Sequence, residues 1–565
     1  MSVNTLYENL KRLRENELHS NVVILADILL SVHDNTKGVN EPEIKLNTMT
    51  FYGESAYHLG KYRKAEKMFN NALQYKKHLM KSKGLSKQIE GQKDILPDSE
   101  IKYKLHLCYV RLNMNEQAIS TLQSVAARQR TVKINMALAK LYHQSGMERS
   151  AITAYKEVLR ECPLALEATE GLLKLGVKST EVNTLVMNSP ELSSFEWLNL
   201  WTKAHAHSQT YDYPTAIAAF RQLVDENSPL RFNPVMMVAL GEIYYYSGDV
   251  TNAKMTLQQA FYIDPTCHRG YGIMATIYLS ERAAGDLEKM MPLNWHFSED
   301  GDSEMWTALA CLLYSNNSLN TAAYFAQRAC LLNPKNVEAL VVKGCILYDM
   351  KKYQNAIVHF REAYEIAPCR YEPHKGLVDC YLAQNRTKDA LTIASNCCKA
   401  DNNSPRALTL YALVLMKDPV NNSKAKSLLE KALDQNDTYL PAVYLLAQVY
   451  EEETSLEPAI NLLQKQVNRN PTAKLHQMLG DLYARSSDDE KAFYHYHTAL
   501  RLEPNNHKAN DGLNRLEHNN GNGDTSAPPR VGLQYLNSSS DTEGGENENT
   551  YEIAASDSEH YMSDD

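Results

Sequence analysis

A spacing of 34 residues constrains this sequence more than any other feature. Between Ser303 and Arg370 the chain reads as two consecutive copies of one unit, and apolar residues at i, i+3, i+4 and i+7 predict two short amphipathic helices in each copy. One such helix pair cannot bury its apolar stripe alone, so the period predicts a stack of pairs. Two alanines and a proline recur 34 residues apart: Ala322, Ala329 and Pro334 correspond to Ala356, Ala363 and Pro368.

Each copy has a large and then a small residue on its first segment, Ala on its second, and a final proline. This order resembles the tetratricopeptide repeat. Gly344 and Ala356 are small, we infer, because the two helices of a hairpin approach closely, and larger side chains there would cost about 1–3 kcal/mol. The resemblance implies an all-α fold, a right-handed superhelical solenoid of helix hairpins.

The pattern continues along most of the chain, and we predict about twelve or thirteen repeats. Two units are weak. Residues 164–190 have a short second helix and lack the small residues, and residues 267–302 keep few of them. The signature positions are Gly53, Ala65, Ala139, Ala151, Gly241, Ala253, Trp306, Ala322, Gly344, Ala356, Ala390, Ala459, Gly480 and Ala492.

Composition sets the segment boundaries. Residues 518–565 are acidic and hold too few apolar residues to offset the entropy of folding, which predicts a disordered acidic tail. Within it, acidic residues follow four candidate phosphorylation sites: Ser540, Ser556, Ser558 and Ser563. We predict an N-terminal helical cap or self-association region (1–44), a first repeat (45–79), an inserted polar loop (80–98), N-terminal and middle repeats (99–302) and C-terminal repeats (303–517).

Bulk properties exclude several classes of protein. A chain of 565 residues exceeds the size of one compact core. Its net charge of −9 argues against nucleic-acid or acidic-membrane binding. No run approaches the ~20 apolar residues of a membrane span, and the charged N-terminus does not match a signal peptide. The ten cysteines form no CxxC pair, which favours a reducing compartment.

No catalytic, metal or cofactor motif stands out, so we expect a protein without enzymatic activity or cofactor. The tempting histidine pairs are His205/His207 and His495/His497. Residues at i and i+2 on a helix point about 200° apart and cannot share a metal, which favours surface or interface histidines. Cys311 and Cys345 occupy one repeat position, which indicates small core residues.

A peptide-binding adaptor is the alternative to a scaffold. Chaperone-binding modules of this class clamp a terminal carboxylate with Lys, Asn and Arg at fixed first-helix positions. One set of matching positions here is Lys133, Met136 and Lys140, so the clamp pattern is absent. This counts against a soluble tetratricopeptide adaptor or co-chaperone. An enzyme with repeats as a substrate arm needs a catalytic domain of about 100 residues, and no such stretch lies outside the repeats and tail.

Several stretches go beyond the generic repeat: Ala127–Met136, Tyr155–Leu166, His359–Ala363 with Ala367–Arg370, Gly376–Ala383, and Asp418–Val420 with Lys424–Leu433, together with Leu18–Asn21 and the acidic tail. They resemble the subunit-seven family of the anaphase-promoting complex, or cyclosome. The resemblance covers nearly the whole chain and rests on residues outside the repeat signature.

The resemblance implies a non-catalytic scaffold in a cullin-RING-type ubiquitin ligase that controls mitosis, in the nucleus and cytoplasm. It also implies homodimers joined through N-terminal repeats and stacked on related subunits. One implied partner is the related repeat subunit that holds the coactivator's Ile-Arg tail. Neither nucleic acid nor a membrane is expected as a partner.

Overall fold

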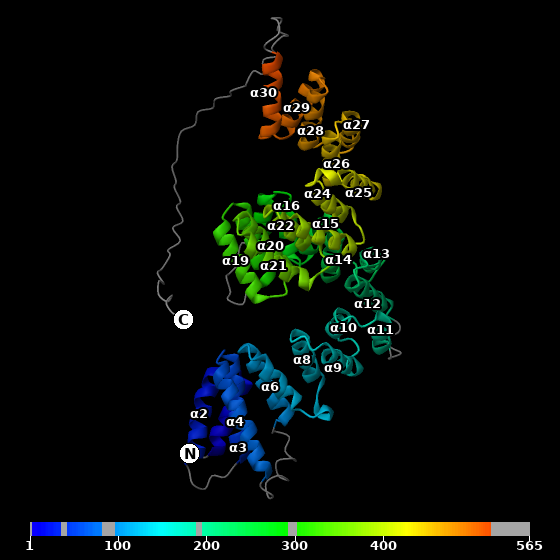
Figure 1. Cartoon of the computed structure of the whole chain (residues 1–565). Coiled ribbons are helices and arrows are strands. Elements are labelled where there is room, and N and C mark those ends of the chain that lie inside the picture. The colour runs from blue at the N-terminus through cyan, green and yellow to red at the C-terminus, as the bar shows by residue number, and fades with distance from the viewer. Residues whose placement is uncertain are drawn as a thin grey trace, which may run out of the picture. The chain divides into compact units, whose positions relative to one another are not determined.

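The computed structural model describes residues 3–35, 42–81, 96–187, 195–225, 227–291 and 302–520, and in these ranges the chain consists of helices and short connections (Figure 1). The first helices are α1 (Val3–Glu15), α2 (His19–Asn35), α3 (Pro42–His58), α4 (Tyr62–Lys81), α6 (Asp98–Arg111), α7 (Asn115–Gln123), α8 (Val132–Gln144), α9 (Glu148–Glu161), α10 (Leu166–Lys174), α11 (Ser179–Val186), α12 (Glu196–Gln209) and α13 (Tyr213–Val224). A 3-10 turn, η1, spans Ala127–Gln129.

The central and C-terminal helices continue the same alternation. They are α14 (Pro234–Ser247), α15 (Val250–Ile263), α16 (Tyr271–Ser280), α17 (Ala284–Met290), α18 (Ser303–Ser315), α19 (Leu319–Leu332), α20 (Val337–Asp349), α21 (Tyr353–Ile366), α22 (Tyr371–Ala383), α23 (Thr387–Ala400), α24 (Pro405–Leu415), η2 (Pro419–Asn421), α25 (Asn422–Gln435), α26 (Leu440–Glu452), α27 (Leu456–Val467), α28 (Ala473–Arg485), α29 (Asp489–Leu502) and α30 (His507–Asn520).

Helix pairs follow one another along the chain. From α3–α4 to α28–α29 there are thirteen successive pairs among the described residues, which agrees with the predicted number of repeats. The helices α1 and α2 pack on each other and α2 packs on α3, so these two helices form a further pair before the first repeat. The all-α solenoid predicted from the 34-residue period is confirmed.

The turn inside each hairpin repeats with the same period. Asn317, Lys351 and Asn385 follow the first helices of three consecutive repeats, and each has φ between 58° and 60°. A residue in this left-handed conformation ends a helix and reverses the chain. Asparagine tolerates it better than most residues, so the local sequence favours the turn at two of the three positions.

The signature positions lie in the core. Trp306 is 2% exposed, and all the signature alanines and glycines are buried. Gly344 faces the ring of Phe360 in its own hairpin, and a Cβ added there would lie 2.6 Å from that ring. Gly376 of the next repeat faces the same ring and approaches it even more closely. The small residues are therefore required by an aromatic ring that fills the space between three helices.

The same arrangement recurs in the C-terminal repeats, where Tyr496 lies between Gly480 and Gly512. It also corrects one sequence expectation. The weak unit 164–190 does contain a small residue, because a Cβ at Gly171 would lie 2.6 Å from the Tyr155 ring. The short second helix expected in the unit 164–190 is present, because α11 has 8 residues. The unit 267–302 also has a short second helix, α17, with 7 residues.

Two of the expected segments, the polar loop and the acidic tail, fall largely on residues that the structure does not describe. The loop expected at 80–98 falls mostly on residues 82–95, which lie outside the described residues, as do residues 521–565 with Ser540, Ser556, Ser558 and Ser563. The helix α30 continues to Asn520, inside the expected tail. The chain divides into two compact units, Met1–Val449 and Tyr450–Asp565, so that the boundary falls within α26.

Candidate functional site: the inner charge cluster of the central repeats

The first helices of the central repeats carry charged residues at one repeated position. In α18, α20 and α22, the second residue is a glutamate, and in α24 the corresponding residue is Arg406. The helix α18 packs on α20, α20 on α22 and α22 on α24, which brings these positions together. We call Glu304, Glu338, Arg370, Glu372 and Arg406 the inner charge cluster. The sequence reasoning missed it, although the 34-residue spacing from Glu304 to Arg406 was a signal that could have revealed it.

Arg370 connects two glutamates of the inner charge cluster. Its Nη2 donates to Glu338 Oε1 at 2.8 Å and its Nε to Glu372 Oε2 at 3.3 Å. Its side chain is only 8% exposed. Burial alone would lower the pKa of this guanidinium, but Glu338 and the other acidic neighbours raise it well above its ordinary value. Arg370 therefore stays positively charged and is held by hydrogen bonds to both glutamates.

Arg406 is bound in the same manner. Its Nε donates to Asp401 Oδ2 at 2.8 Å, and its Nη1 lies 3.9 Å from Glu372 Oε1. Its guanidinium also lies 5.1 Å from the ring centroid of Tyr371. Burial opposes the charge, while Asp401 and Glu372 favour it, and the net effect raises the pKa of Arg406.

Glu304 differs from the other glutamates because no cation is paired with it within the described residues. Its Oε2 accepts the backbone N–H of Gly272 at 2.9 Å, and its Oε1 lies 3.5 Å from Asn336 Nδ2. Burial, and then the charge of Glu338, raise the pKa of Glu304 to about 8. This carboxyl group holds a proton near neutral pH, so the two glutamates can lie side by side.

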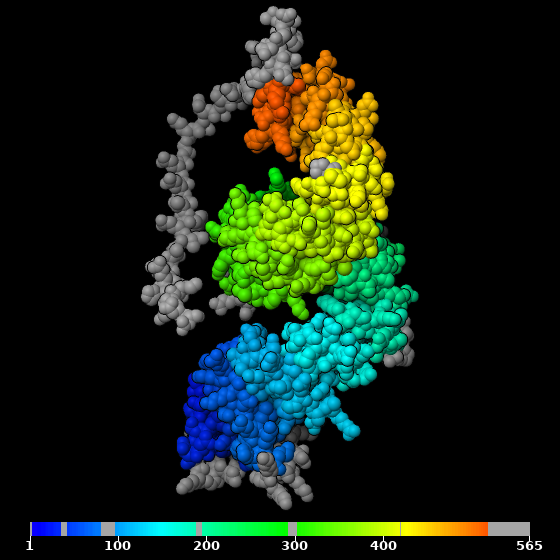
Figure 2. Space-filling model, in the orientation of Figure 1, coloured from blue at the N-terminus to red at the C-terminus, as the bar shows by residue number. Residues whose placement is uncertain are grey.

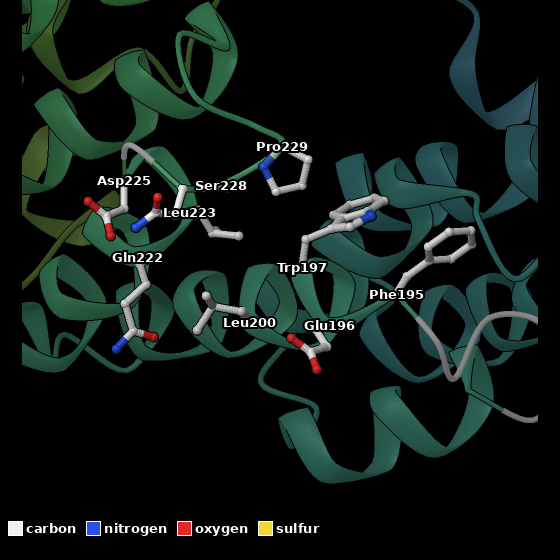
Figure 3. Close-up of a pocket in the computed structure, with 10 residues that line it drawn as sticks. Phe195, Glu196, Trp197, Leu200, Gln222, Leu223, Asp225, Ser228 and Pro229 are labelled. Atoms are coloured by element: carbon white, nitrogen blue, oxygen red, sulfur yellow. The ribbon is translucent and has the colours of Figure 1, made fainter.

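A surface cavity of about 490 Å³ lies between α12 and the connection from α13 to α14 (Figure 3). In the view shown, Asp225 and Gln222 lie at the left end of the cavity and Phe195 lies at the right end, while Leu200 and Leu223 lie between them. The described lining includes no histidine, lysine or cysteine.

The members of the two histidine pairs considered in the sequence, His205/His207 and His495/His497, have different environments in the structure. His205 is buried beside Trp201 and Phe220, and burial lowers its pKa to about 3, whereas His207 Nδ1 lies 3.2 Å from Asp212 Oδ2. His495 pairs with His476, not His497: their Nδ1 atoms are 3.0 Å apart. Burial, and then His476, lower the pKa of His495 to about 4, which makes the pair a neutral hydrogen bond in the core. The 19-residue separation of this pair gave no sequence signal.

The remaining candidate residues have structural contacts. Lys133 Nζ lies 2.6 Å from Glu100 Oε2, and Lys140 Nζ lies 2.6 Å from Glu167 Oε1. Both pairs join neighbouring first helices. Burial raises the pKa of Cys311 and Cys345, so neither thiol is a nucleophile near neutral pH. Among the described residues, no group of three or more His, Cys, Asp or Glu side chains is arranged to hold a metal ion.

No described helix combines the length and apolar character needed to cross a bilayer. The described chain is a series of packed helix hairpins in which small residues contact aromatic rings at repeated positions. This architecture is that of a tetratricopeptide-repeat protein. Models of the tetratricopeptide repeat match residues 235–267, 347–414 and 421–482.

Comparison with curated proteins identifies the family. "Anaphase-promoting complex subunit 7" of Mus musculus and of Homo sapiens are each 36% identical to this chain over 507 residues, which is 88% of this chain and 89% of the relative. The protein of that name in Arabidopsis thaliana is 25% identical over 532 residues, with 90% and 93% covered. The chain belongs to the family of anaphase-promoting complex subunit 7.

The fold has a counterpart among solved structures. A chain in the crystal structure of the APC/C hetero-tetramer Cut9-Hcn1 superposes with a TM-score of 0.55 at 14% sequence identity, covering 91% of this chain and 96% of that chain. At this identity the likeness concerns the fold alone.

Proposed function

We propose that this chain is a non-catalytic scaffold subunit of an anaphase-promoting complex, a multisubunit ubiquitin ligase. The observation that carries the proposal is the combination of family membership over 88% of the chain with a hairpin stack that accounts for the described residues. Such a stack offers extended surfaces for other proteins and has no separate catalytic domain. The subunit acts by holding other subunits at fixed positions.

The proposed partners are the other subunits of that complex, above all the related repeat subunit that binds the coactivator, and a second copy of this chain. The proposed location is the nucleus and cytoplasm. Support for self-association comes from α2, where Ile24 is 61% exposed and Ile28 is 51% exposed one turn later. Apolar residues this exposed at neighbouring positions are typical of a protein contact.

Native affinity isolation tests the scaffold role. The full chain, tagged at one end, is isolated from cells under native conditions, and the co-purifying proteins are quantified by mass spectrometry. We expect the other subunits of the complex, including its cullin-like and RING members, in fixed stoichiometry. Recovery of chaperones alone would instead support the adaptor alternative and refute the scaffold proposal.

A further inference from the structure

Arg370 and Arg406 of the inner charge cluster lie at helix N-termini, where a capping residue or an acidic residue would stabilise the helix better. The N-cap positions of α18, α20 and α24 are Asp302, Asn336 and Ser404, and each side chain accepts a backbone N–H of its helix. The corresponding residue of α22 is Arg370, whose side chain makes no capping hydrogen bond. A cation at a helix N-terminus also opposes the helix dipole.

Arg406 shows the same conflict. It lies in the first turn of α24, at the position where α18, α20 and α22 have a glutamate that favours the dipole. A residue that destabilises its own helix end suggests a compensating contact elsewhere in the fold. The geometry identifies that contact.

Both arginines reach the C-terminal end of α14. Arg406 Nη2 donates to the backbone carbonyl of Tyr246 at 2.5 Å, a contact between residues 160 positions apart. The Arg370 guanidinium lies 3.9 Å from the ring centroid of Tyr246 and 5.7 Å from that of Tyr245. A Cβ at Gly248, the left-handed residue that ends α14, would lie 3.4 Å from Arg406 Cδ.

These contacts join two ends of one superhelical turn. The first helices from α14 to α24 belong to six consecutive repeats, and the arginines connect the first of them with the fifth and sixth. The positive charges of the two guanidinium groups are neutralised by Glu338, Glu372 and Asp401, which accept hydrogen bonds from Arg370 and Arg406. Figure 2 shows the green and yellow-green residues of these repeats packed as one continuous body on the face drawn.

We propose that Arg370, Arg406 and Tyr246 form an intramolecular clasp that locks the turn from α14 to α24 closed. A simple stack of repeats has contacts between neighbours only, so its repeats open one after another. The clasp adds a contact between distant repeats, which makes the turn open as one unit. It also fills the inner surface at this level with the chain's own side chains, so an extended peptide reaches that surface only after the clasp opens.

Hydrogen exchange of the full chain, followed by mass spectrometry, tests the clasp with Arg406→Gln. We expect amide exchange to become at least about tenfold faster in the last turn of α14 as well as at the N-termini of α22 and α24, because loss of a buried hydrogen bond from a charged donor strongly favours local opening. Exchange in α8 and α9, outside the turn, stays unchanged.

The matched control is Arg386→Gln. Arg386 pairs with Asp389 at 2.6 Å and lies 4.8 Å from the Tyr381 ring centroid, so it loses the same types of contact, but only within its own hairpin. We expect faster exchange in α22 and α23 and no change in α14.

A second variant, Tyr246→Leu, retains the carbonyl that binds Arg406 and removes the ring beside Arg370. It should accelerate exchange in the same segments of α14 and α22 by a smaller factor, and it remains informative if Arg406→Gln does not fold. The proposal is overturned if the exchange rate of α14 in both Arg406→Gln and Tyr246→Leu stays the same as in the native chain, or does not exceed the rate in Arg386→Gln.

Discussion

Single side chains determine how closely successive repeats approach. The Phe360 ring touches Gly344 of its own hairpin and Gly376 of the next, and both approaches are too close for any Cβ. The ring therefore connects three helices of two repeats. In the C-terminal unit, Tyr496 has the same role between Gly480 and Gly512.

Gly376→Ala should lower the free energy of unfolding by about 1–3 kcal/mol, because the added methyl group overpacks the contact with Phe360. Thermal unfolding followed by circular dichroism measures the loss. The control is Gly285→Ala in α17, where an added Cβ meets nothing within 4 Å. That variant should gain about 0.5–1 kcal/mol from helix propensity. Equal effects of the two variants would contradict the packing argument.

Glu304 should make stability depend on pH near neutrality. Its pKa is about 8 in the folded chain, raised by burial and then by Glu338, against an ordinary value of 4.5. Between these values the folded state keeps the proton and the unfolded state has lost it, so stability falls as the pH rises through this window and levels off above about 8.

Glu304→Gln removes this dependence, since glutamine resembles the protonated carboxyl group. Between about pH 6 and pH 8, the native chain should lose roughly 2 kcal/mol more of unfolding free energy than the variant. Urea unfolding at several pH values provides the comparison. The exposed Glu365→Gln is the control and should keep the pH dependence of the native chain; parallel curves for Glu304→Gln and the native chain would refute the assignment.

The sequence predicted core residues better than it predicted the charge cluster. Gly344 and Ala356 were expected to be small, and the 34-residue period was sufficient for that because the reason is local to one hairpin. The contact between Arg406 and Tyr246 spans 160 residues and depends on the curvature accumulated over six repeats. No spacing in the sequence encodes that curvature directly.

At the scale of elements, α2 is amphipathic with an additional exposed apolar row. Val22, Ala26 and Leu29 are fully buried, whereas Ile24 and Ile28 are more than half exposed. The sequence showed an apolar helix but did not reveal which of its residues face outward. The packing of α2 on α3 leaves this second row uncovered within the described residues.

Replacing both residues, Ile24→Glu with Ile28→Glu, should weaken the proposed self-association at least about tenfold, because central apolar contacts carry most of the energy of such interfaces. Sedimentation equilibrium measures the association, and circular dichroism should show unchanged helicity. Val358→Glu, at a 47% exposed position of α21, is the control. A double variant that still sediments as a dimer would place the interface elsewhere.

At the scale of the whole molecule, the chain is built from repeats, and within each of its two compact units the stability of a repeat depends on its contacts with neighbouring repeats. The positions Ala356 and Ala492 are equivalent and both are fully buried. They differ in place, because Ala356 lies in the turn from α14 to α24 and Ala492 lies in the last helix pair before α30.

Ala356→Glu and Ala492→Glu each bury an unpaired carboxylate. Ala492→Glu should unfold only the last helices, while Ala356→Glu should disrupt several repeats, so its loss of helical signal near 37 °C should be several times larger. Circular dichroism with limited proteolysis distinguishes them. An unchanged melting curve for Ala356→Glu would mean that the assigned repeat register is wrong.

The ring of Phe360 has a consequence for protein engineering. Because it contacts glycines 16 residues before and 16 residues after it, the smallest transplantable module is not one hairpin. It is one second helix together with the first helices on both sides. A repeat moved between proteins along hairpin boundaries would carry an aromatic ring into a neighbour that has no glycine to receive it. Exchange of repeats should therefore succeed at cuts inside the turns that flank such three-helix modules.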